Sequence, residues 1–182
     1  MGSSINTIPS AKNYYKATQI ANQLCELGIS SLFRGNQQIT DAILSGYYLG
    51  KHDNPLATPE TVCLNCFEDT QKIQVDDKGS TKIVTDKLFQ QKMVFNQFSN
   101  FGRIFFPGGT QIMDSFYEDL CLIQTRKTNA LPIALVNSDF WTPWHDYFKN
   151  VLLPGGTISE RDLSLYRIID DADEVVPYLL GA

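Results

Sequence analysis

The sequence predicts an α/β fold in which a doubly wound parallel sheet is flanked by helices. Segments with apolar residues at helical spacing alternate with short apolar or β-branched runs, which is the order that βαβ units produce. Residues 131–136 form a continuous apolar run, as in a strand that helices cover on both faces. The length of 182 residues suits one domain, so we expect a single domain over 1–182.

The first third of the chain predicts a helix over residues 11–27, where apolar side chains recur at helical spacing. Ser10 before it is a suitable N-cap, and Gly28 after it is a suitable C-cap. A strand, a helix and a strand are expected next, over residues 29–33, 39–49 and 61–67. The polar stretch 68–85 is expected to be a surface excursion, with a hairpin turn at 77–79 and room for a lid.

The rest of the chain continues the alternation. Strands are expected over residues 103–106, 131–136 and 165–169. Helices are expected over residues 86–98, 112–124, 140–153, 158–163 and 170–180. Ligands of such folds bind at the carboxyl ends of the strands, so the ligand site is expected at the connections 34–39 and 107–112.

The charge balance excludes some classes of partner. Fifteen basic and twenty acidic side chains give a net charge of -5, which argues against binding to nucleic-acid polymers or anionic membranes. No apolar run is long enough to span a membrane, and no signal sequence is evident. We therefore expect a cytoplasmic protein.

The thiols and imidazoles do not indicate a metal site. Cys63 and Cys66 have CxxC spacing, but positions i and i+3 of a strand point to opposite faces. We therefore expect reduced, largely buried thiols, with a redox or zinc role as the alternative. His52 and His145 lie in separate regions without other ligands nearby, so no metal is expected.

A glycine turn is the first candidate site. Gly108 and Gly109 lie between a predicted strand and a predicted helix, followed by Thr110 and Gln111. Backbone N–H groups and the helix dipole favour a phosphate at such a position, and glycine lets the ligand approach the main chain. The alternative is a turn with a purely structural role.

Several segments of the chain resemble the LOG family, Rossmann-like proteins often labelled "lysine decarboxylase-like". The motifs that carry the resemblance are Phe-Gln-Gln-Lys at 89–92, Ile-Phe-Phe-Pro-Gly-Gly at 104–109, Leu-Cys-Leu-Ile-Gln-Thr at 120–125, Leu-Pro-Ile-Ala-Leu-Val at 131–136, Ile-Ser at 158–159 and Asp-Asp-Ala-Asp-Glu at 170–174. The N-terminal half fits more loosely, through Gly-Ser-Ser at 2–4 and residues 17–33. The resemblance implies a Rossmann-like doubly wound fold.

The resemblance also places the family's first strand upstream of Met1, so the fold is expected to lack that strand. The alternatives are a late start of the reading frame, another segment in the place of the strand, and an accidental likeness of the first residues.

The resemblance implies hydrolysis of a nucleoside 5'-monophosphate to a free base and ribose 5-phosphate. Family members use an Arg-Lys pair and the motif Pro-Gly-Gly-x-Gly-Thr-x-x-Glu, and the transition state needs the carboxylate. Here Lys92 matches the lysine, but Gln91 stands at the arginine position and Ser115 at the glutamate position. The third glycine and the threonine are replaced by Gln111 and Ile112, and Ile112 narrows the approach of a phosphate.

Nearby residues could substitute for the missing groups. Asp114 and Glu118 could supply a carboxylate, unless Asp114 only favours the helix dipole and Glu118 is solvated. Arg34 and Gly35 stand in the second phosphate-loop region, where Arg34 could supply a cation. Lys92 is either a phosphate ligand or a surface charge.

We therefore expect a divergent LOG-like protein that binds a nucleoside monophosphate or sugar phosphate without the family's activity. The alternatives are an active phosphoribohydrolase with relocated catalytic residues and a partner-binding protein that uses residues 68–85. No cofactor is expected, and lysine decarboxylation is excluded because nothing marks the groups that pyridoxal phosphate needs.

The resemblance also implies a homodimer joined through helices. Six aromatic residues lie around the corresponding helices, namely Phe89, Phe95, Phe98, Phe101, Phe116 and Tyr117. Trp141 and Trp144 are expected to be packing residues rather than a stacking platform for a base.

Overall fold

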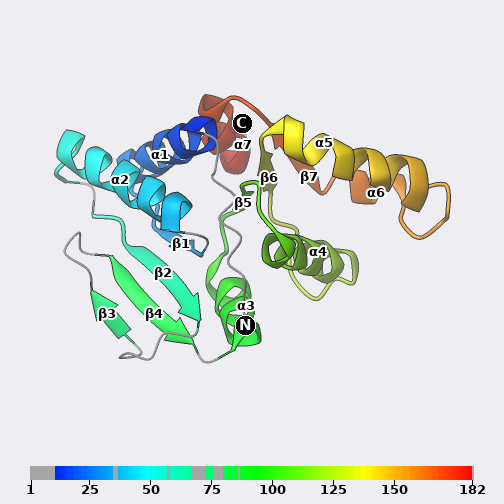
Figure 1. Cartoon of the computed structure of the whole chain (residues 1–182), viewed down its shortest axis with the longest axis horizontal. Helices are drawn as coiled ribbons and strands as arrows, with labels where there is room; N and C mark the ends of the chain where they lie inside the picture. The colour runs from blue at the N-terminus through cyan, green and yellow to red at the C-terminus, as the bar shows by residue number, and fades with distance from the viewer. Residues whose placement is uncertain are drawn as a thin grey trace. The chain divides into compact units, whose positions relative to one another are not determined.

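The computed structural model describes residues 11–34, 37–56, 58–66, 73–75, 80–85 and 87–181. The described residues divide between residues 99 and 100 into two units, each with its own sheet (Figure 1). The strands run mainly in parallel and alternate with helices, so the predicted α/β, Rossmann-like class is confirmed. The single domain over 1–182 stays a prediction.

The sheet of the first unit has the strand order β1-β2-β4-β3. β1 (Ser31–Phe33) pairs in parallel with β2 (Thr61–Cys66), and β2 pairs in parallel with β4 (Thr81–Thr85). β3 (Ile73–Val75) runs antiparallel to β4, which makes the expected hairpin. Its turn at 77–79 lies outside the described residues.

The prediction of a surface excursion over residues 68–85 was wrong for β4. Thr81–Thr85 is an inner strand of the sheet and therefore cannot belong to a lid. Only Val84 in this strand is fully buried, and its polar neighbours are half-buried. Because the strand needs few apolar side chains, its sequence does not show the pattern of an inner strand.

Three helices belong to the first unit: α1 (Ala11–Glu26), α2 (Gln37–Asp53) and α3 (Leu88–Phe98). The helix predicted over 11–27 is confirmed, and the one predicted over 39–49 is longer at both ends. α1 and α2 pack closely because Gly46 faces Ala21, where an added Cβ would lie 2.6 Å from the Ala21 Cβ. Ser10, the predicted N-cap, is outside the described residues.

The sheet of the second unit is parallel and has the strand order β5-β6-β7. The bounds of these strands are Arg103–Phe105, Ile133–Val136 and Tyr166–Ile169. The helices are α4 (Thr110–Gln124), α5 (Ser138–Tyr147), α6 (Glu160–Leu163) and α7 (Ala172–Leu180), and a π-helical segment (Phe148–Leu152) continues α5. All the elements predicted after residue 100 are therefore confirmed in type and order.

β6 is covered on both faces, as its apolar run predicts. Ile133 and Leu135 face a cluster built from α4, α5 and the π-helical segment. Their neighbours Ala134 and Val136 point to the opposite face, where α7 packs against β6 (Figure 1). Each of these four residues is buried, so β6 is the centre of this unit.

Phe116 of α4 is the central ring of that cluster. It is 1% exposed, and its ring contacts those of Phe105, Trp141 and Tyr166 at centroid distances of 5.3 to 5.6 Å. Phe116 was expected to be among the aromatic residues of a dimer surface. Because it is buried, it cannot contribute to such a surface. Trp141 is fully buried and Trp144 packs on the cluster, which confirms both as packing residues.

The structure also describes three of the four cysteines. Cys25, Cys63 and Cys121 are free thiols, and the first two are buried. The side chain of Cys66 lies outside the described part of the chain. Among the described residues no helix is both long and apolar enough to cross a membrane.

Replacing Phe116 with alanine should lower the free energy of unfolding by about 3 to 5 kcal/mol, because it leaves a cavity among the rings that pack around it. Leu180→Ala is the control, since Leu180 lies on α7 of the same unit and is 52% exposed. Its effect should stay within about 0.5 kcal/mol. Urea denaturation followed by tryptophan fluorescence measures both changes. Equal effects of the two substitutions would contradict the central role of Phe116.

Candidate functional site

The glycine turn lies at the carboxyl end of β5 and leads directly into α4. Gly109 is the N-cap of this helix, and its carbonyl accepts from the backbone N–H groups of Ile112 at 2.9 Å and Met113 at 3.2 Å. The helix therefore begins at Thr110, two residues earlier than predicted. The Thr110 and Gln111 residues are exposed on its first turn. Here the helix dipole and the first N–H groups favour an anion.

The two glycines of the turn have different surroundings. A Cβ added to Gly108 would lie 2.3 Å from the Ile112 Cγ1 atom, so the Ile112 side chain fills the space beside Gly108. A Cβ added to Gly109 would have no atom within 4 Å. A ligand can therefore approach the backbone at Gly109. At Gly108 the branched side chain of Ile112 occupies the space that a ligand would need, as predicted.

A buried ion pair holds α4 against the neighbouring strand. The Arg103 guanidinium on β5 lies 2.9 Å from the Asp119 carboxylate on α4, and these side chains are 10% and 6% exposed. The pair sets the position of α4, and thus of the turn that precedes it. Asp119 was not among the residues predicted from the sequence, although a carboxylate next to Leu120 on the apolar face of a helix is a detectable signal.

The predicted carboxylates both lie on α4. Asp114 is exposed and Glu118 is half-buried, and their spacing of four residues places them on the same face of the helix. Ser115, which the resemblance is expected to place at the glutamate position, donates its hydroxyl to the Gln111 carbonyl at 3.2 Å. That side chain is therefore bonded to its own helix, and it cannot act as an acid.

The structure brings Arg34 and Gln91 together, although 57 positions separate them. The Arg34 Nη1 atom donates to the Gln91 Oε1 atom at 3.3 Å, and the guanidinium lies 5.7 Å from the centroid of the Phe95 ring. Gln91 is 3% exposed. Arg34 directly follows β1, so its cation is positioned at the carboxyl end of a parallel strand by a buried amide and an aromatic face.

Lys92 and Gly35 are the two remaining residues predicted to bind a phosphate. Lys92 follows Gln91 on α3 and is half-buried. Gly35 lies outside the described residues.

The ends of β6 and β7 carry polar residues that the sequence analysis did not single out as a site. The Ser138 N–H donates to the Asp170 carboxylate at 2.9 Å, and the Ser138 hydroxyl donates to the same carboxylate. Asn137, between β6 and α5, has a φ of 90°, which is unusual for a residue other than glycine. These residues lie at the same edge of the sheet as the glycine turn, because parallel strands end at one edge. In the sequence, these residues could have been found because a polar residue follows each of these two strands directly.

Metal ligands are not clustered in the parts of the chain that the structure describes. No group of three or more His, Cys, Asp or Glu side chains there is placed to hold a metal ion.

Comparison with known proteins gives one family match. The family model described as "possible lysine decarboxylase" matches residues 42–179, which is well over half of the chain. None of the curated proteins matches the chain.

The two glycines should respond oppositely to alanine. Gly108→Ala should destabilise the fold by about 1 to 3 kcal/mol, because its Cβ overlaps the Ile112 side chain. Gly109→Ala should change stability by less than about 0.5 kcal/mol, because its φ of -79° suits alanine and its Cβ meets open space. Thermal unfolding of both variants checks the contrast. A Gly108→Ala variant as stable as Gly109→Ala would contradict the packing of Ile112.

Proposed function

Because this chain belongs to the family described as "possible lysine decarboxylase", which is the LOG family, we propose that it binds a phosphate-bearing ligand without hydrolysing it. The ligand class is a nucleoside monophosphate or a sugar phosphate. The observation that carries the proposal is the open approach to Gly109 at the N-terminus of α4. Backbone N–H groups recognise a phosphate whatever side chains surround them.

In the first unit, Arg34 is a second candidate phosphate ligand, and its role does not depend on the glycine turn of the second unit. Family resemblance places an arginine at position 91, where this chain has a buried glutamine. Here the Arg34 guanidinium donates to the Gln91 side chain, so a cation from the end of β1 reaches this position on α3. Arginine binds phosphate through several N–H donors in a fixed plane. Arg34 can therefore supply the donors that an arginine at position 91 would have supplied.

The side chains of α4 support the absence of N-glycosidic hydrolysis. An oxocarbenium-like transition state needs a nearby carboxylate, and Ser115 stands where the family has one. The Ser115 hydroxyl is engaged with the Gln111 carbonyl, and Ile112 fills the space beside Gly108. The alternative function, hydrolysis with relocated groups, would use Asp114 or Glu118.

We further propose that the protein acts in the cytoplasm, where free nucleotides and sugar phosphates occur, and that it forms a homodimer. Phe89 and Phe98 of α3 and Phe101 are exposed and suit a contact with a second copy.

The first test is an assay for hydrolysis. Incubation with AMP, or with other nucleoside monophosphates, should release no free base above the buffer blank, as measured by reversed-phase chromatography. Release at an enzyme-like rate that Asp114→Ala or Glu118→Ala abolishes would overturn the proposal and establish the alternative function.

The second test concerns phosphate binding. AMP and ribose 5-phosphate should raise the melting temperature, whereas adenosine and ribose should not, because only the first two carry a phosphate. Arg34→Gln should weaken binding of AMP by about tenfold, since a charge-assisted hydrogen bond is lost. Lys12→Ala removes an exposed charge from α1 and should leave the affinity unchanged.

The double variant Arg34→Gln with Gln91→Arg exchanges the two side chains. If binding requires only a guanidinium at this place, whichever of the two positions supplies it, the double variant should bind AMP as the unmodified protein does. An equal response to ribose and ribose 5-phosphate would contradict phosphate recognition itself. An Arg34→Gln variant that binds AMP normally would contradict only the role of Arg34.

A further inference from the structure

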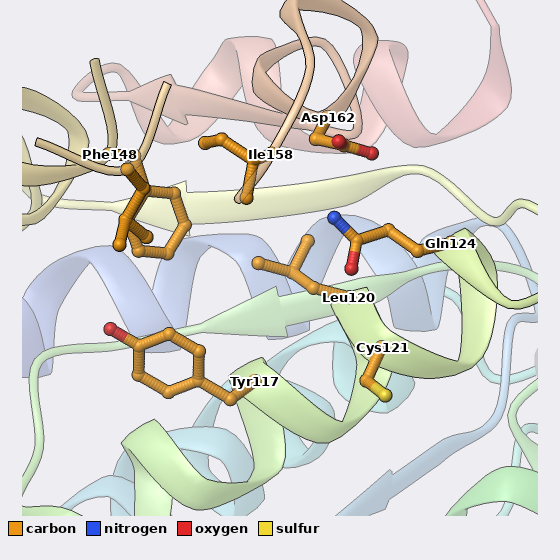
Figure 2. A pocket seen from close by; sticks show the side chains of 8 residues that line it. Tyr117, Leu120, Cys121, Gln124, Phe148, Ile158 and Asp162 are labelled. Atoms are coloured by element: carbon orange, nitrogen blue, oxygen red, sulfur yellow. The ribbon is translucent and has the colours of Figure 1, made fainter. Parts of the chain in front are cut away.

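The second unit holds a pocket of about 270 Å³ between α4, the π-helical segment and α6. Its apolar lining consists of Leu120, Phe148, Leu152 and Ile158, together with the Tyr117 ring. Figure 2 shows the Tyr117 and Phe148 rings at one end and the Gln124 and Asp162 side chains at the other. The pocket therefore has an aromatic end and a polar end.

The volume limits what the pocket can hold. An apolar cavity of about 150 Å³ in a protein core is known to accept one benzene molecule. A pocket nearly twice as large has room for a fused two-ring system with a short side chain.

The aromatic end is shaped by an uncommon backbone. Phe148–Leu152 is π-helical, and the Leu153 N–H donates to the Phe148 carbonyl five residues earlier, at 2.9 Å. This segment supplies Phe148 and Leu152 to the pocket. The centroids of the Phe148 and Tyr117 rings lie 5.7 Å apart and the ring planes meet at 50°, so the two rings form one aromatic wall of the pocket. π-Helical turns are rare and often accompany functional sites.

The polar end presents hydrogen-bond acceptors. The Asp162 carboxylate accepts from the Ser159 N–H at 2.7 Å and from the Ser159 hydroxyl at 2.9 Å. Burial raises the pKa of Asp162, but these bonds, one from the Gln124 side chain and the charge of Arg161 together outweigh burial and hold the pKa below its ordinary value. Asp162 is therefore ionised at neutral pH. Because Gln124 donates through its amide nitrogen, its oxygen is left as an acceptor, and in Figure 2 that oxygen points toward Leu120.

We propose that this pocket binds a small aromatic amine, with the ring system against Tyr117 and Phe148 and the ammonium group at the Asp162 carboxylate. The charge of the carboxylate selects a cation, and the acceptor oxygens suit its N–H donors. An aromatic carboxylate of the same size would instead meet a like charge.

This site is separate from the glycine turn. Leu120 lies eleven positions after Gly109, which corresponds to about 16 Å along α4. The proposal therefore stands independently of phosphate binding.

The test uses tryptamine and indole-3-propionate, which share a ring system and carry opposite charges. Tryptamine should bind with a dissociation constant in the millimolar range, as expected for so few atoms. It should shift the backbone NMR signals of Leu120, Gln124 and Leu152, and indole-3-propionate should not. Absence of such shifts at millimolar tryptamine, or equal binding of both compounds, would overturn the proposal.

Three variants locate the binding. Asp162→Asn should weaken tryptamine binding about tenfold, the loss expected for a charge-assisted hydrogen bond. Glu160→Gln is the matched control, because it removes an exposed charge from the same helix, outside the pocket lining. Leu152→Trp should fill the pocket and abolish binding. If Asp162→Asn loses the cap of α6 and unfolds, Leu152→Trp still tests whether tryptamine binds in this pocket. Binding that survives Leu152→Trp, or that Glu160→Gln weakens as much as Asp162→Asn, would contradict this site.

Discussion

The second unit depends on the packing of α4 against the sheet. Phe116 inserts among the rings of the core, and the Arg103–Asp119 ion pair fixes the helix on β5. A buried pair of this kind contributes little net stability, but it is costly to break and so favours one orientation of the helix. That orientation decides where both candidate sites lie, because α4 carries the glycine turn at its start and half of the pocket near its end.

Binding and catalysis place different demands on the chain. Phosphate recognition by a helix N-terminus uses backbone N–H groups and the dipole, so it tolerates changes of side chain. Stabilisation of an oxocarbenium-like transition state needs a carboxylate at one position. Under the proposed function, Ser115 takes the place of the catalytic carboxylate, whereas the backbone of the turn can still bind a phosphate. The pairing of Arg34 with Gln91 follows the same logic, since a guanidinium can reach a phosphate from either strand or helix.

Much of the fold could be predicted from the sequence because its signals are local. The apolar run of β6, the spacing of apolar residues in α1 and the glycine turn each depend on neighbours within a few residues. β4 was missed because only one of its residues is fully buried, so its polar pattern is that of a surface strand. Asp119 was missed because its partner, Arg103, is brought to it only when α4 packs on β5.

The sequence by itself determined the alternation of strands and helices and the position of the glycine turn, and it carries the resemblance on which the proposed loss of catalysis rests. Each of these is a property of residue identity and spacing. Only the tertiary structure decided that Arg34 meets Gln91, that Ile112 fills the space beside Gly108, and that α4, the π-helical segment and α6 enclose a pocket. These features join side chains that are distant in the chain or depend on their directions, and such contacts form only when elements pack.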